Sequence, residues 1–174
     1  MQIREYAETD WARVWPFFDE VVADGETYAL PQGLTSQRAR DLWVQPPPWA
    51  TFVAVEDDGT DDGTGDGTGE EEVLGTAKCG PVRPGGGAHV ATASFMVSPA
   101  ARGRGVGRAL GEHVLAWARA QGYLAVQFNA VVETNTAAVA LWTSLGFAIV
   151  GTVPQAFDHP EHGYVGLHVM HRFL

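Results

Sequence analysis

The sequence predicts an α+β domain, sandwich-like in build, in which helices flank one mixed β-sheet. Three observations lead to this class. Strand-like apolar runs flank segments with helical periodicity along the sequence. The 174 residues are 45% hydrophobic, which is enough for a single compact core. A strand-like run also leads directly into a glycine-rich turn and then a helix at residues 91–111, and the rest of the protein is organised around this stretch.

The N-terminal part is predicted to form a strand followed by a helix. Residues 2–6 fit a strand, and Thr9 or Asp10 is suited to cap a helix over residues 10–23. Pro16 predicts a kink or a restart within that helix. Its apolar stripe consists of Trp11, Val14, Trp15, Phe18 and Val22.

A second helix and a hairpin come next. The short helix begins at Thr35 or Ser36 and ends before a run of three prolines. Residues 51–56 and 73–82 read as the two strands of the hairpin. Between them, residues 56–72 hold nine acidic residues and no base, so we expect a solvated, disordered hairpin insertion. Its recurring Asp-Gly-Thr matches neither an EF-hand nor a nonapeptide calcium repeat.

The glycine-rich turn itself predicts an anion site. A strand over 91–97 ends before Pro99, and Arg102-Gly103-Arg104-Gly105-Val106-Gly107 then opens a helix with an apolar face. Alternate glycines let the backbone turn sharply and leave its N–H groups uncovered. A helix N-terminus adds unpaired N–H groups and partial positive charge, so a phosphate or pyrophosphate is the expected ligand. A plain connecting loop is the alternative.

The C-terminal part alternates strands and one more helix. Residues 124–131 fit a strand, and Thr134 is expected to cap a helix that ends at Gly146. A strand over 147–153, a loop over 155–163 and a last strand over 164–173 follow.

The motifs narrow the kind of phosphate ligand. The dinucleotide fingerprint G-x-G-x-x-G fails in both registers, and no G-K-[ST] follows, which excludes a P-loop. Residues 102–107 fit R-x-x-G-x-G, which resembles the acyl-CoA pyrophosphate loop of the GCN5-related N-acetyltransferase (GNAT) family. Residues 135–147, NTAAVALWTSLGF, are similar to that family's N-x-x-A-x-x-L-[Y]-x-x-x-G-F signature. The strong resemblance covers 91–153.

This resemblance implies the GNAT acyl-CoA N-acyltransferase fold over residues 1–174 as a single domain, with a mostly antiparallel, centrally splayed sheet. It also implies acetyl-CoA as co-substrate and no metal. The backbone of the central strand is expected to pair with the pantetheine arm, the turn to hold the pyrophosphate, and an asparagine to bind the arm near the thioester. The implied cofactor-binding residues are Phe95, Met96, Val97, Arg102, Gly103, Arg104, Gly105, Val106, Gly107, Arg108 and Asn135.

The catalytic groups are less well defined by the sequence. Trp142 stands where many relatives have a tyrosine, and an indole cannot protonate a thiolate, so Tyr164 or water is expected to replace it, or the thiolate leaves unprotonated. His89 and Asn129 are the candidate catalytic residues, each with a structural alternative. Glu133 is a further candidate for the base. The D-H-P-E-H loop, with His159 and His162, is a candidate either for a cover over the mouth of the pocket or for a metal cluster.

The expected function is transfer of an acetyl group to the amine of a small molecule in a ternary complex. An amino acid or amino-acid-like compound is the expected acceptor, compatible with the phosphinothricin-type branch of the family. Glu26 and Tyr28 are candidate substrate-binding residues, because the region after the first helix usually walls the acceptor pocket in this family. Trp142 is the third candidate, as a wall of the thioester channel. The alternative is a CoA-binding sensor or regulatory module without turnover.

Charge and cysteine content limit the cellular compartments and the kinds of partner that we expect for this protein. The net charge is −10, and setting aside the acidic insertion leaves about −1, so no nucleic-acid surface is expected. No run of apolar residues is long enough to span a membrane, and no signal peptide is recognisable. A single cysteine, Cys79, suits a reducing cytoplasm and reads as a buried structural thiol. A homodimer is left open.

Overall fold

A computed structural model describes residues 1–57 and 71–174. The described residues form a seven-stranded mixed sheet in the order β1-β2-β3-β4-β5-β7-β6. All neighbouring strands run antiparallel except β4 and β5, which are parallel. The strands are β1 (Gln2–Glu5), β2 (Ala50–Asp57), β3 (Glu71–Pro81), β4 (Val90–Val97), β5 (Ala125–Val132), β6 (Ala148–His159) and β7 (Gly163–Phe173), and the α-helices are α1 (Trp11–Asp24), α2 (Ser36–Trp43), α3 (Val106–Ala120) and α4 (Thr136–Ser144). The predicted α+β class is confirmed.

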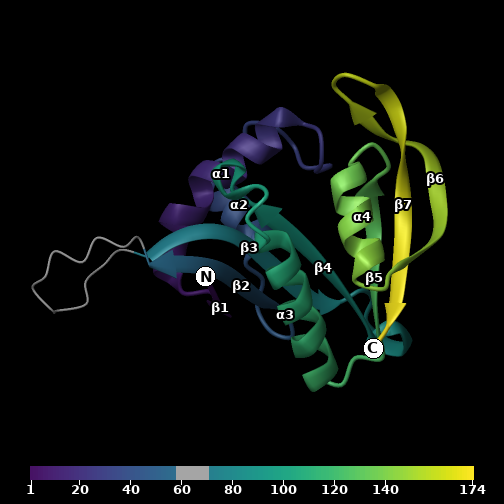
Figure 1. Ribbon diagram of the computed structural model, residues 1–174, viewed down its shortest axis with the longest axis horizontal. Coiled ribbons are helices and arrows are strands. Elements are labelled where there is room, and N and C mark those ends of the chain that lie inside the picture. The colour runs from purple at the N-terminus through teal and green to yellow at the C-terminus, as the bar shows by residue number, and fades with distance from the viewer. Residues whose placement is uncertain (58–70) are drawn as a thin grey trace, which may run out of the picture.

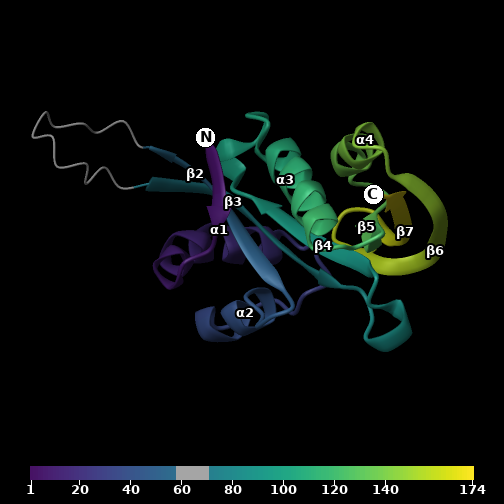
Figure 2. The same ribbon diagram turned by 90° about the horizontal axis from the view of Figure 1, so that it is seen from below.

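Helices cover both faces of this sheet (Figures 1 and 2). Helices α1 and α2 pack on one face, where Phe18, Trp43 and Met96 belong to one buried cluster. Helices α3 and α4 lie on the other face, where Leu110 and Trp142 are part of a second cluster. The sheet therefore has a core on each side, as the sandwich-like prediction required.

The sheet opens between its two central strands. The parallel register of β4 and β5 holds only at Val90 with Ala125 and Ala91 with Val126. Beyond these pairs the strands diverge, which separates the β1–β4 half from the β5–β7–β6 half (Figure 1). The gap faces the end of β4 that leads into the glycine-rich turn, so the fold places that turn beside the opening.

Several predicted boundaries need correction. Helix α1 continues through Pro16, so the predicted restart is wrong; one lost i→i−4 hydrogen bond is tolerated because the apolar stripe of the helix is buried. The side chain of Asn135, not Thr134, caps α4 by accepting from the N–H of Ala138. Strand β6 reaches His159, so most of the predicted loop over 155–163 belongs to a long β6–β7 hairpin.

The acidic insertion is described only at its two ends. Glu56 and Asp57 close β2, and pair with Glu72 and Glu71 of β3. These four residues lie in the sheet and not in a disordered insertion, because the hairpin ladder continues to its last pair. Residues 58–70, which carry the rest of the prediction, lie outside the described residues.

Candidate active site

A cavity of about 680 Å³ occupies the gap between β4 and β5. Both diverging strands contribute to its wall, together with the α1–α2 loop, the start of α4 and the end of β6. The residues that line it include Glu26, Tyr28, Phe95, Arg102, Phe128, Asn129, Asn135, Trp142 and His159. The size falls within the range of small-molecule sites, about 300–1,000 Å³.

The edge of β4 that faces this cavity carries backbone groups that no strand pairs. The N–H of Ser98 donates to β3 at Leu74, whereas the C=O of His89 accepts from Leu124 on the β5 side. Polar groups of successive residues alternate across a strand, so Phe95 and Val97 present theirs to the cavity. The backbone of Met96 pairs with β3 instead, although the residue lines the cavity, so its predicted pairing with a pantetheine arm has no open backbone group behind it.

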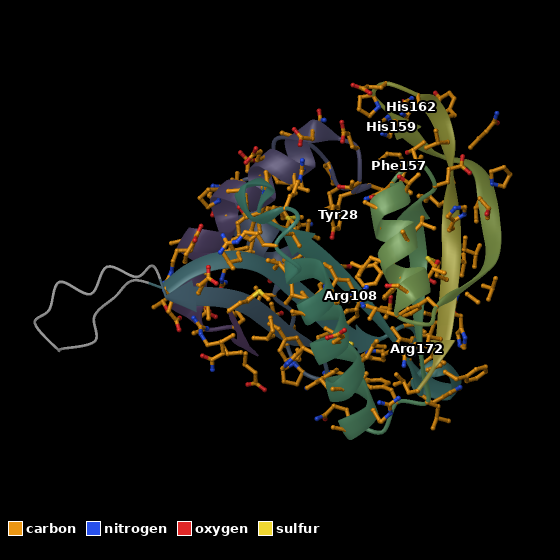
Figure 3. All side chains as sticks on the ribbon, viewed as in Figure 1. Tyr28, Arg108, Phe157, His159, His162 and Arg172 are labelled. Carbon is orange, nitrogen blue, oxygen red and sulfur yellow. The ribbon has the colours of Figure 1, made fainter. Side chains whose placement is uncertain are left out.

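Tyr28 already uses one of these edge groups. Its hydroxyl donates to the backbone carbonyl of Phe95, and its ring packs edge-on against Trp43, with the ring centroids 5.9 Å apart. Burial raises the pKa of the Tyr28 hydroxyl, and the hydrogen bond to Phe95 offsets this only in part. Tyr28 is therefore a neutral donor that fixes the α1–α2 loop against the open edge (Figure 3).

The glycine-rich turn presents unpaired N–H groups beside this edge. Gly103 and Gly105 have φ of +78° and +81°, and a Cβ at either position would meet nothing within 4 Å. Gly105 is the N-cap of α3 and supplies no side-chain cap. Among the described residues, no acceptor is found for the N–H groups of Gly103, Gly105, Val106, Gly107 and Arg108. Such a cluster at a helix N-terminus is suited to an anion, so the role expected of this turn stays a prediction with this geometry behind it.

The arginines of the turn differ in their partners. Arg104 forms an ion pair with Glu56 on β2, so its guanidinium is engaged with the sheet. Arg108 donates to Ser144 at 2.8 Å and lies 3.6 Å from Glu112, which links the start of α3 to the end of α4. Arg102 has no such partner among the described residues and lines the cavity. Of these side chains, Arg102 is the one available to an anion in the cavity.

An aromatic wall closes the cavity on the α3–α4 side. The ring of Trp142 lies 4.6 Å from that of Phe95 and 4.9 Å from that of Phe128, centroid to centroid. A Cβ added at Gly111 would lie 3.1 Å from Trp142, so α3 and α4 also approach closely here. Tyr164 is 71% exposed on β7 and does not line the cavity, which removes it as a substitute for the tyrosine that relatives carry at the Trp142 position.

Two asparagines line the cavity on the β5 side. Asn129 lies at a bulge, where the pairing with β7 shifts between Phe128 and Val131, and its Oδ1 accepts from Gln127 at 2.6 Å. Its amide nitrogen is left to face a ligand. The Oδ1 of Asn135 is used as the cap of α4, at 3.0 Å from the N–H of Ala138, so it too has only its amide nitrogen to offer.

Two predicted bases lie outside the cavity. His89 is exposed and precedes β4 at the end where β4 and β5 still pair, so the structure does not bring it to the site. The carboxylate of Glu133 accepts from the N–H of Gly166 and fastens β5 to β7. Neither can act on a group inside the cavity, and the catalytic role expected of His89 has no geometric support.

The D-H-P-E-H segment divides between cavity and solvent. His159 is 6% exposed and lines the cavity, whereas His162 is exposed and stacks on it with a centroid distance of 4.6 Å. In residues 1–57 and 71–174, no group of three or more His, Cys, Asp and Glu side chains is placed to hold a metal ion. Sequence reasoning placed His159 only at the mouth, because the extension of β6 to this residue gave no clear periodic signal.

Two further predictions concern the thiol and the membrane. Cys79 is fully buried, and burial raises the pKa of its thiol to about 12, so it is a structural group and not a nucleophile. Within the described part of the protein, the helices are too short or too polar to cross a bilayer.

Comparisons with known proteins match this geometry. The model of a family described as the acetyltransferase (GNAT) family matches residues 14–147. A GCN5-related N-acetyltransferase from Kribbella flavida is 57% identical, with a TM-score of 0.89 over 99% of this chain and 97% of that chain. The N-acetyltransferase aca1 of Schizosaccharomyces pombe is 28% identical over 159 residues, 88% of this chain and 75% of that protein.

A more distant structure shares the fold. It is a GNAT superfamily phosphinothricin acetyltransferase from Sinorhizobium meliloti in complex with AcCoA, 20% identical, with a TM-score of 0.80 over 99% of this chain and 88% of that chain. At this identity the likeness concerns the fold alone.

Proposed function

Because the protein belongs to the acetyltransferase (GNAT) family, it is an acetyltransferase that uses acetyl-CoA, and we propose that its acceptor is the amine of a small molecule. The observation that carries the proposal is the continuity of the site. Unpaired N–H groups of the turn, the free edge of β4 and the cavity follow one another without interruption. An extended anionic cofactor needs these features in this order.

The residues present fit the two parts of the cofactor that must be held. The N–H groups from Gly103 to Arg108 and the guanidinium of Arg102 suit a pyrophosphate. The N–H groups of Phe95 and Val97 suit the amides of a pantetheine arm, in the manner of an added strand. Acetyl-CoA, when bound, supplies an acetyl thioester for attack by an amine.

The other lining groups orient the acceptor. Phe95, Phe128 and Trp142 form an apolar wall that excludes water from the reacting end. The amide nitrogens of Asn129 and Asn135 are donors for polar atoms of either ligand. Glu26 lines the cavity, and its carboxylate attracts the acceptor while the amine of the acceptor is still a protonated ammonium. With Tyr164 outside the cavity, either water protonates the leaving thiolate or the thiolate leaves unprotonated.

The size of the cavity and the loops beside it support a small acceptor. A Cβ built on Gly25 would lie 3.9 Å from Pro160, so the α1–α2 loop and the β6–β7 turn are neighbours at one end of the gap. The cavity of about 680 Å³ has the size of a small-molecule site, which suits a compact amine beside the acetyl end of the cofactor. A cytoplasmic location belongs to the same proposal and is supported by the single, buried cysteine, Cys79.

The test is release of free CoA from acetyl-CoA in the presence of a panel of small amines, with the product identified by mass spectrometry. We expect turnover with at least one amine and none with short peptides of matched composition. Tight binding of acetyl-CoA without acetylation of any amine in the panel would refute the small-amine acceptor.

A further inference from the structure

The ring of His159 is held in one tautomer by its own turn. Its Nδ1 accepts from the backbone N–H of Glu161 at 3.2 Å and from that of His162 at 3.3 Å. Two donors aimed at Nδ1 leave no room for a proton on that atom, so the ring proton lies on Nε2. His159 therefore offers an N–H donor in a fixed direction.

The same ring is fixed in orientation by its neighbours (Figure 3). His162 stacks on one side, and Phe157 meets it edge-on with the ring centroids 6.3 Å apart. Only 6% of the residue is exposed, and the residue lines the cavity.

The Nε2 atom of His159 has no hydrogen-bond partner among the described residues. In the same part of the protein, the buried side-chain polar atoms without a partner are the hydroxyls of Tyr6, Thr51 and Thr134, so Nε2 keeps some accessible surface. Because His159 lines the cavity, we infer that this surface faces the cavity. An orientated donor without a protein acceptor at this place is suited to a ligand atom.

The surroundings of His159 show which ligand it faces. A Cβ built on Gly25 would lie 3.9 Å from Pro160, so the α1–α2 loop that carries Glu26 lies beside the turn that follows His159. Glu26 and His159 both line the cavity. The glycine-rich turn lies at the end of β4, on the far side of Phe95. His159 thus serves the acceptor part of the site and not the part suited to a pyrophosphate.

We propose that His159 determines acceptor specificity by donating its Nε2–H to an oxygen of the acceptor, so that preferred acceptors are small amines carrying a carbonyl or carboxylate oxygen. The proposal rests on the proposed function. Glu26 attracts the ammonium of such a molecule, and His159 binds its oxygen. A site built to pair a substrate oxygen rejects the analogue that lacks it, because the buried donor is then left unpaired.

The experiment compares acceptors that share one side chain and differ in the carboxyl group, which is intact, converted to the amide or absent. Leucine and methionine are each tested beside the corresponding amide and the decarboxylated amine, at saturating acetyl-CoA. The variants are His159→Phe, which removes the donor, and His159→Gln, which keeps a side-chain donor and an acceptor for the turn. His162→Phe is the matched control, since it alters the exposed neighbour.

We expect wild type to prefer the oxygen-bearing acceptors by at least about tenfold in kcat/KM. His159→Phe should lower kcat/KM for the oxygen-bearing acceptors about tenfold, through a higher KM. The same variant should leave kcat/KM for the decarboxylated amines and the KM for acetyl-CoA unchanged. His159→Gln should recover most of the lost kcat/KM. Comparison of kcat/KM for the amino acids with that for their amides shows whether His159 binds a carboxylate oxygen or a carbonyl oxygen.

Equal losses for all amines, no loss, or no wild-type preference would overturn the inference while the acetyltransferase function stands. Failure of wild type to acetylate any amine refutes the proposed function, and the inference with it.

Discussion

Substitution of Gly105 separates the role of the glycine-rich turn in binding from its role in folding. Gly105 has φ of +81° with nothing within 4 Å of an added Cβ, and Gly122, just past the other end of α3, has φ of +83° and equally open surroundings. A residue with a Cβ in this left-handed region costs about 1–2 kcal/mol. Gly105→Val and Gly122→Val should therefore lower the melting temperature to a similar extent, about 2–8 °C.

Affinity for acetyl-CoA should distinguish the two variants. Only at position 105 does the new side chain stand among the unpaired N–H groups of the turn. We expect Gly105→Val to weaken acetyl-CoA binding at least about tenfold, which is about 1.4 kcal/mol, and Gly122→Val to leave it unchanged. Isothermal titration calorimetry on both folded variants measures this. Equal affinities in the two variants would refute the assignment of the turn as the pyrophosphate site.

Three further predictions test the wall of the cavity and the stability of the fold. Trp142→Phe should keep most activity, whereas Trp142→Ala should lose its activity together with about 3–5 kcal/mol of stability. Release of CoA measures the activity and urea unfolding measures the stability. A Phe variant that is folded but as inactive as the Ala variant would contradict the role of Trp142 as a wall. Burial lowers the pKa of His113, so the unfolded state takes up a proton first and stability should fall as pH drops below about 6.5; His113→Gln should flatten that slope in urea titrations at several pH values. Burial alone would raise the pKa of Asp10, but its hydrogen bonds, above all the one from Arg4, lower that pKa overall. Asp10→Asn should therefore lower the free energy of unfolding by about 3 kcal/mol at pH 7. A loss below about 1 kcal/mol would show that the pair of Arg4 and Asp10 is dispensable.

The turn and its helix were predictable from sequence because their signals are local. Alternate glycines between Arg102 and Gly107 and the apolar spacing after Val106 give the turn and the start of α3 directly, and both glycines that lie outside the helix adopt positive φ. The boundaries of the strands on the N-terminal side were predicted to within about two residues for the same reason.

The acceptor side depends on contacts between distant segments, which local patterns do not report. The bond from Tyr28 to Phe95 joins residues 67 apart in sequence, and the ion pair of Arg104 with Glu56 joins residues 48 apart. The sequence shows that His89 directly precedes a strand. Only the pairing of β4 with β5 shows that His89 lies at the end where these two strands are still joined. Trp142 was predictable as a cavity wall, whereas the fixed tautomer of His159 depends on turn geometry alone.

The most direct test of the account is amide hydrogen exchange along β4, measured by NMR with and without saturating acetyl-CoA. The N–H groups of Phe95 and Val97 face the cavity, whereas those of Ser94 and Met96 face β3. Acetyl-CoA should slow exchange at Phe95 and Val97 and leave the already protected Ser94 and Met96 unchanged. Unaltered exchange at Phe95 and Val97 while acetyl-CoA is bound would contradict the placement of the cofactor along this edge.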